Sequence, residues 1–293
     1  MKTLRPYKHK YKQLEFFIAD NIDISTFRDE MESMEHPFFA LKGGDMKIRE
    51  YKNGNVLVIV RPAAEIGLAT IFDKDIWIYA ISKLQEAINN NQPINRTIAF
   101  TPYNFFVTTN RAKSGRAYED LKKALSRLSG TRIQTNIIHT NYDKKIIDFG
   151  LIDKWEIVEK KKGKLEIGMV KVTLPDWLYL AITKTKVLQI NPDFFRIRKA
   201  IDRRIYEIAR KHCGSQYEFT ISLEKLYFKI GTSSLLKEFR RKLKALLRSN
   251  DLPDYKIFLD VLSDKITFKN RNKNCSKTSI SYNQEKDKEE WIY

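Results

Sequence analysis

The sequence has few of the residues that build metal sites or disulfides. It contains two cysteines, Cys213 and Cys275, and four histidines, and none of them falls at a Cys-x-x-Cys or paired Cys/His spacing. Structural zinc needs four such ligands, and proteins of a reducing compartment rarely hold disulfides. We therefore expect no metal, no cofactor and no disulfide, and a cytoplasmic location.

The motifs of common nucleic-acid enzymes are missing too. The only Gly-Lys pair, Gly163-Lys164, is followed by Leu165, so there is no phosphate-binding P-loop. No close histidine pair stands beside a tyrosine, as a rolling-circle nicking enzyme would need. Asp73 and Asp75 could form a metal-binding pair, but acidic residues at a helix N-terminus explain them more simply. The sequence predicts a protein without a catalytic centre.

Long apolar segments are also absent. The longest uninterrupted aliphatic run is Val56 to Val60, far short of the ~20 residues that a membrane-spanning helix needs. Residues 1–6 carry charges with no apolar stretch after them, unlike a signal peptide. We expect no membrane span and no secretion.

Positive charge, in contrast, is abundant. Lys and Arg number 54 against 36 Asp and Glu in 293 residues, a net charge of +18. Residues 192–273 alone hold 20 Lys and Arg against 10 Asp and Glu. Such an excess indicates a polyanionic partner, namely DNA, RNA or an anionic membrane. A basic surface that serves only solubility is the alternative.

One order of predicted elements occurs twice: helix, strand, helix, turn, helix, then two strands. The first copy occupies residues 73–90, 97–100, 103–109, 110–115, 118–128, and 131–138 with 145–157. The second occupies residues 192–212, 217–221, 222–230, 231–233, 235–249, and 255–262 with 265–268. This is the order of a winged helix, a helix-turn-helix followed by a β-hairpin wing.

We therefore predict an α+β protein with two tandem winged-helix domains. The predicted division is a mobile N-terminal arm (residues 1–35), a first winged-helix domain with linker strands (36–190), a second winged-helix domain (191–271) and a disordered tail (272–293).

The third helix of the second copy has two distinct faces. Leu236, Phe239, Leu243 and Leu246 are spaced 3, 4 and 3 apart and form an apolar face. Four cations spaced 4, 3 and 4 apart form a basic stripe, and Arg240 flanks it; the four are Lys237, Arg241, Lys244 and Arg248. A helix with one face in the core and a basic face outside suits the major groove of DNA. The alternative is a solvated helix face.

The first copy repeats this arrangement more weakly. Its predicted contact residues on the third helix are Arg116, Lys122, Lys123 and Arg127, and those in the preceding turn are Arg111 and Lys113. This face could instead contact another protein. In the wing of the second copy, Lys265, Lys269 and Arg271 are predicted to reach a groove or a phosphate. The many Phe and Tyr could stack on single-stranded bases, but most have core-like spacing.

Short blocks of sequence, in order from about residue 36 to 271, resemble the plasmid replication initiator protein A (RepA) family. These blocks are residues 38–45 (FFALKGGD), 67–76 (GLATIFDKDI), 109–111 (TNR), Leu128 with 130–133 (GTRI), 149–152 (FGLI), Leu174 with 176–178 (DWL), 206–214 (YEIARKHCG) and 238–241 (EFRR).

The resemblance implies an initiator that binds repeated double-stranded sites at a plasmid origin and helps to open the origin. It also implies recruitment of host proteins, among them the host initiator DnaA and the replicative helicase, and a switch between monomer and dimer. It implies no catalytic residues. The alternatives are a winged-helix transcriptional regulator with the same DNA-binding elements, and an enzyme such as a relaxase or primase.

Overall fold

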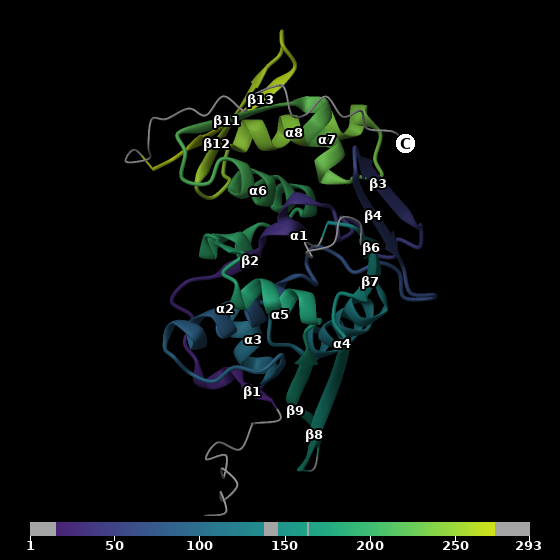
Figure 1. Cartoon of the computed structure of the whole chain (residues 1–293), viewed down its shortest axis with the longest axis vertical. Coiled ribbons are helices and arrows are strands. Elements are labelled where there is room, and N and C mark those ends of the chain that lie inside the picture. The colour runs from purple at the N-terminus through teal and green to yellow at the C-terminus, as the bar shows by residue number, and fades with distance from the viewer. Residues whose placement is uncertain (1–15, 138–145, 163, 273–293) are drawn as a thin grey trace, which may run out of the picture.

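The computed structural model describes residues 16–137, 146–162 and 164–272. Within them, helices and strands form two hydrophobic cores that follow one another along the long axis of the molecule (Figure 1). The first core is built from residues up to Val187, and the second mainly from residues after Ile190. The architecture is α+β, with two tandem winged-helix domains, as predicted.

The prediction of a mobile arm over residues 1–35 is wrong for residues 17–35. Strand β1 (Phe17–Ile18) runs parallel to β5 (Thr97–Phe100), and β2 (Arg28–Glu30) pairs with β10 (Val187–Gln189). Between them lies a 3-10 turn, η1 (Ala19–Asn21), and after β2 comes the short helix α1 (Met31–Glu35). Met34 is completely buried in the second core. This segment therefore fastens the two domains together; residues 1–15 lie outside the described residues.

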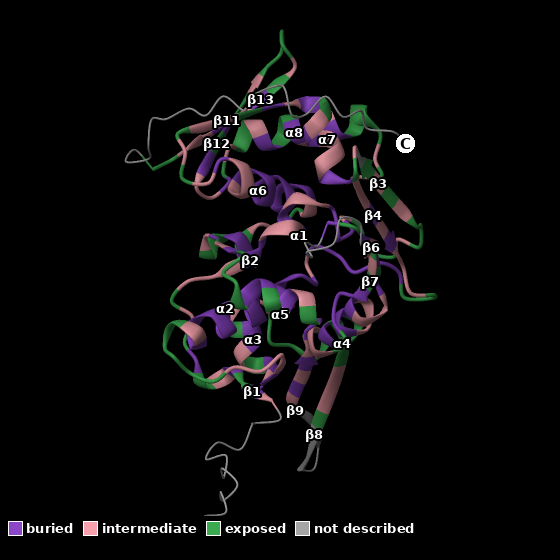
Figure 2. Ribbon diagram, in the orientation of Figure 1, coloured by how far each residue is buried: buried purple, intermediate pink, exposed green. Residues whose placement is uncertain are grey.

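The first helix-turn-helix forms where the sequence predicts it. Its elements are α2 (Asp75–Asn89), β5 (Thr97–Phe100), α3 (Pro102–Thr108) and α4 (Gly115–Gly130). The Thr101 side chain accepts a hydrogen bond from the Asn104 amide at 3.3 Å, and Pro102 occupies the first helical turn. Helix α2 is buried along most of its length (Figure 2), because the other elements of the domain surround it.

The wing of the first domain is not where the sequence predicts it. Strands β6 (Arg132–Thr135) and β7 (Ile147–Gly150) join β3 (Arg49–Asn53) and β4 (Val56–Arg61) in a separate sheet of order β3-β4-β6-β7. The hairpin that pairs with β5 is β8 (Lys154–Lys162) with β9 (Lys164–Thr173). A later hairpin than the one predicted from residues 131–138 and 145–157 thus forms the wing. Helix α5 (Asp176–Thr183) then leads to β10.

The second domain follows the predicted order except at its start. A 3-10 turn, η2 (Pro192–Arg196), precedes α6 (Ala200–His212), so the predicted single helix over 192–212 is wrong before residue 200. Ile197 and Lys199 have extended backbones, which interrupts the helix. The rest comprises β11 (Glu218–Ser222), α7 (Leu223–Ile230), α8 (Leu236–Ser249), β12 (Tyr255–Asp260) and β13 (Lys265–Asn270), with sheet order β11-β13-β12.

Local signals fix the turn of this second helix-turn-helix. The Ser222 hydroxyl accepts a hydrogen bond from the Lys225 amide at 3.2 Å and caps α7. Gly231 ends α7 with a φ of +65°, a conformation that favours glycine. A Cβ at Gly231 would lie 2.4 Å from the Pro37 side chain. This turn is therefore packed directly against the first domain.

Buried charges join the two domains. Lys74, at the start of α2, lies 2.7 Å from Asp29 and 2.9 Å from Glu207 of α6. Asp75 binds Arg203 of α6 at 2.6 Å. Arg204 donates to Glu207 and to the carbonyl groups of Ser33 and Met34. Two cations of α6, Arg203 and Arg204, are therefore almost fully buried in this junction and are not available to DNA.

No helix among the described ranges is long and apolar enough to span a membrane.

Candidate nucleic-acid interface

Helix α8 presents the basic stripe that its sequence predicts. Lys237, Arg241, Lys244 and Arg248 are all exposed, whereas Phe239, Leu243 and Leu246 are buried. Leu236, predicted on the apolar face, is partly exposed in the first turn. Arg241 is held by Glu238 one turn earlier, with an Nε–Oε2 distance of 2.9 Å. The helix thus has a core face and a cationic solvent face, as insertion into a DNA groove requires.

Arg240 is not free to contact DNA in this structure. It donates two hydrogen bonds, of 2.8 and 2.6 Å, to the carboxylate of Asp264 in the turn of the β12–β13 wing. A bidentate pair of this kind fixes orientation as well as distance. Arg240 therefore positions the wing against α8.

Of the three residues predicted in the second wing, one is exposed and two have partners within the protein. Lys265 is exposed. Lys269 pairs with Glu218 at 3.2 Å and lies over the rings of Tyr217 and Phe258. Arg271 donates to the carbonyl groups of Leu252 and Asn250, beyond the C-terminal end of α8. Of the three, Lys265 is the one best placed for a DNA phosphate, and Arg271 has a structural role.

In the first domain, four of the six predicted cations are exposed around α4. They are Lys113, Arg116, Lys122 and Lys123. The Arg116 side chain is 91% exposed and lies 4.0 Å from Asp120. The Lys113 ammonium lies 5.0 Å from the centre of the Tyr103 ring. These four side chains form the first-domain counterpart of the stripe on α8.

Arg111 and Arg127 are instead committed to buried carboxylates. Arg127 binds Asp73 through two hydrogen bonds of 2.7 and 2.8 Å. Arg111 binds Asp75 at 2.8 Å, and Asp75 also holds Arg203. The residue at the N-cap of α2 is Lys74, which makes no side-chain cap. Arginine therefore binds the carboxylates of both Asp73 and Asp75, and Asp75 lies in the first turn of α2, as expected for an acidic residue at a helix N-terminus.

We expect Arg127→Ala to lower the free energy of unfolding by about 2 kcal/mol, since it leaves the buried Asp73 carboxylate without a cation and with only the Thr70 amide as donor. Lys123→Ala, on the same helix and exposed, should change that free energy by no more than about 0.5 kcal/mol. Chemical denaturation of both variants measures the difference. If the two variants were equally stable, Arg127 would have no structural role and would count as a surface cation that can contact DNA.

The sequence reasoning missed two features of the wings. In the first wing, the sequence places Lys160, Lys161, Lys162 and Lys164 on either side of Gly163, and Lys162 pairs with Lys164 in the backbone register of β8 and β9. In the second wing, Val261 and Leu262 are 79% and 99% exposed at the hairpin tip. A glycine among lysines between two strand-like runs was the available signal for the first of these.

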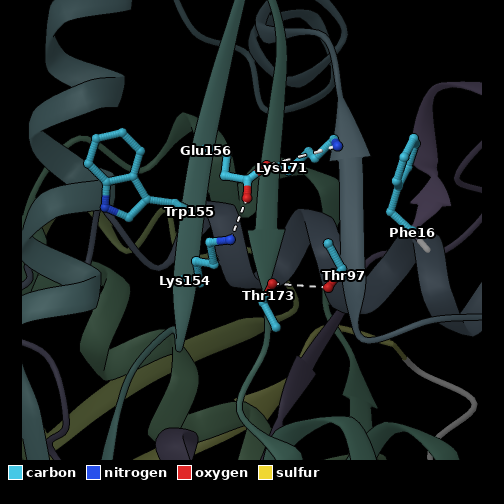
Figure 3. A pocket seen from close by; sticks show the side chains of 7 residues that line it. All are labelled: Phe16, Thr97, Lys154, Trp155, Glu156, Lys171 and Thr173. Carbon is cyan, nitrogen blue, oxygen red and sulfur yellow. Dashed lines mark hydrogen bonds and ion pairs between the residues drawn. The ribbon is translucent and has the colours of Figure 1, made fainter.

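A small recess lies on the outer surface of β5, β9 and β8 (Figure 3). It has a volume of about 200 Å³ and is lined by Lys154, Lys171, Glu156, two threonines and two aromatic residues. Glu156 lies 2.5 Å from Lys154 and 3.9 Å from Lys171. Glu156 therefore pairs with both lysines, which leaves one net positive charge in the recess and only a weak attraction to an anion.

The part of the chain that the structure describes contains no group of three His, Cys, Asp or Glu side chains placed to hold a metal ion.

Comparison with known proteins identifies the family. Residues 28–257 match the family model described as "Replication initiator protein A". A protein of Wigglesworthia glossinidia brevipalpis named "Putative replication protein" is 58% identical over 265 residues, which cover 90% of this chain and 96% of that one.

The fold is similar to that of crystal structures of domains 2 and 3 of RctB. One has a TM-score of 0.58 at 11% identity and covers 81% of this chain and 97% of that chain. A second has a TM-score of 0.51 at 10% identity and covers 79% and 95%. At such identities the likeness concerns the fold alone. Together, the family match and the near full-length relative show that the chain belongs to the replication initiator protein A family.

Proposed function

We propose that this replication initiator binds repeated double-stranded DNA sites at a plasmid origin through α8, α4 and the two wings, and that it has no catalytic centre of its own. The observation that carries the proposal is the pair of faces on α8, with Leu243 buried and Lys244 beside it exposed. Cations on such a helix can contact both phosphates and guanine edges.

The proposed division of labour between the domains follows from their exposed cations. On α8, four cations project to solvent, and Lys265 lies nearby in the wing. On and before α4, four more are exposed. Each domain therefore has its own surface for one segment of duplex, which fits a protein that covers a long site. We propose that the protein acts in the cytoplasm, recruits DnaA and the replicative helicase, and changes between monomer and dimer, as the family resemblance implies.

The first experiment is a footprint on the DNA that flanks the gene, followed by binding titrations at several salt concentrations. If six to eight phosphates are neutralised, the logarithm of the affinity should fall against that of salt with a slope of about −5 to −7. Removing two stripe cations, with Lys244→Gln and Arg248→Gln, should make the slope shallower by about two units.

A matched control removes two exposed lysines outside the proposed interface, Lys184→Gln and Lys186→Gln. Its salt slope should stay that of the unchanged protein. A slope near zero for the unchanged protein, or the same loss in the control pair, would contradict the proposed interface. Incubation with supercoiled origin DNA and magnesium tests the proposed absence of catalysis, because a nicking enzyme would relax the plasmid.

A further inference from the structure

A larger pocket lies where the two domains meet beside α8. Its volume is about 470 Å³. The first domain contributes Leu41, Lys42 and Arg49, and the second contributes the start of α6, the turn between α7 and α8, and one side of α8. Figure 1 shows β3, which carries Arg49, next to the end of α7, and Arg49 donates a hydrogen bond of 2.7 Å to the Gly231 carbonyl. Both domains therefore build the pocket walls.

The lining of this pocket is strongly cationic. Five basic residues face one carboxylate, Asp202; the five are Lys42, Arg49, Lys199, Arg241 and Lys242. Thr232, Ser233 and Ser234 add hydroxyl groups. In the recess on β5, β9 and β8, by comparison, two lysines share one glutamate. The junction pocket thus combines an excess of positive charge with hydrogen-bond donors, which is the chemistry that holds a phosphate group.

Three of the five cations are held only loosely. Among the described residues, Lys42 has no ion-pair partner. Lys199 lies 3.9 Å from Asp202 with most of its side chain exposed, and the Lys242 ammonium lies 3.4 Å from the Ser234 hydroxyl. The other two have firm partners: Arg49 binds Asp45, and Arg241 binds Glu238. An incoming anion could therefore bind Lys42, Lys199 and Lys242 without breaking a strong ion pair.

The single carboxylate is poorly suited to neutralise these cations. Asp202 is 8% exposed, and burial raises its pKa to about 6, although Lys199 acts in the opposite direction. Close to neutral pH, a neighbouring phosphate would repel the ionised form. Asp202 therefore opposes anion binding, and its removal should strengthen such binding.

The pocket adjoins the stripe on α8. Arg241 belongs to both, and Lys242 and Ala245 lie between the stripe and the buried side of the helix. A duplex lying along the stripe would bring its backbone to the mouth of the pocket, at the point where the first domain begins. A phosphate could reach the pocket from this duplex or as part of a free nucleotide.

We propose that this pocket is a binding site for a phosphate group, supplied by the DNA backbone where it passes from one domain to the other. The source of the phosphate rests on the proposed function, whereas the site itself does not. A backbone phosphate held by residues of both domains would fix their relative orientation on the DNA, so the pocket would set the spacing between the two contact surfaces.

The site is tested first without DNA, by calorimetric titration of the full chain with pyrophosphate at low salt. We expect one saturable site, at least tenfold weaker in the Lys42→Gln/Lys242→Gln variant and tighter in Asp202→Asn. The Lys184→Gln/Lys186→Gln pair, with the same loss of charge away from the pocket, should bind as the unchanged protein does. Absence of saturable binding, or the same weakening in both double variants, would overturn the proposal.

The second arm identifies the source of the phosphate. If the backbone supplies it, the Lys42→Gln/Lys242→Gln variant should bind duplex with a salt slope shallower by about one unit, and saturating duplex should prevent pyrophosphate binding. Full DNA affinity in that variant, with pyrophosphate still bound to the DNA complex, would overturn the backbone as the source and assign the site to a free nucleotide. If the protein bound no DNA at all, the proposed function would fail while the pyrophosphate titration still decided the site.

Discussion

Replacement of Lys74 by Met should destabilise the protein by about 3–5 kcal/mol, the range seen when one partner of a buried ion pair is removed. Lys74 is completely buried, and its ammonium lies within 3 Å of carboxylate oxygens from Asp29 and Glu207. Met has a similar length and volume, so the loss would come from charge and not from a cavity. Urea unfolding followed by circular dichroism measures it.

The pH dependence of this loss has a definite sign. Burial raises the pKa of Asp29 to about 6 even though the charge of Lys74 lowers it. Without Lys74 that pKa should rise further. A carboxyl group with a raised pKa in the folded state favours folding at low pH, and this contribution is lost as the pH rises through the folded-state pKa. The Lys74→Met variant should therefore lose more stability at pH 8 than at pH 5.

A second substitution separates the charge effect from general disruption. In Lys74→Met/Asp29→Asn, no ionised group at position 29 remains without its partner, while Glu207 keeps Arg204 at 2.8 Å. Most of the lost stability should return. Lys237→Met, at an exposed position, should change stability by no more than about 0.5 kcal/mol. If the double variant were as unstable as the single one, the buried ion pair would not be the cause.

Alanine substitutions at two adjacent positions of α8 should have different effects, one on stability and the other on DNA binding. Leu243→Ala removes a side chain that is 1% exposed and should lower the free energy of unfolding by about 2–5 kcal/mol through the cavity that it leaves. Lys244→Ala should leave stability nearly unchanged and should cost about 1–3 kcal/mol of DNA-binding free energy if the lysine contacts a base edge. A melting curve and a binding titration for each variant provide the four values.

The pattern of these four values is what tests the assignment of α8. Any DNA-binding defect of Leu243→Ala should disappear at temperatures where the variant is fully folded. Early melting of Lys244→Ala, or origin binding by it at the strength of the unchanged protein, would place the recognition surface on another element.

The sequence alone determined the local architecture of each helix-turn-helix. The caps at Thr101 and Ser222 and the left-handed Gly231 were readable because each depends on residues within a few positions of it. The two faces of α8 were readable because helical periodicity places Leu243 and Lys244 on different sides.

Only the tertiary structure decided which hairpin became the first wing and which cations remained free. Several strand-like runs of similar composition follow β5 in the sequence, and each could have paired with it. Its pairing with β9, about seventy positions later, depends on the packing of the whole domain. Arg127 and Lys123 look alike in sequence. Arg127 is committed to Asp73, 54 positions away, and Lys74 to Glu207, 133 positions away. Periodicity tells which face of a helix a charge occupies, but the fold alone brings a distant carboxylate to it.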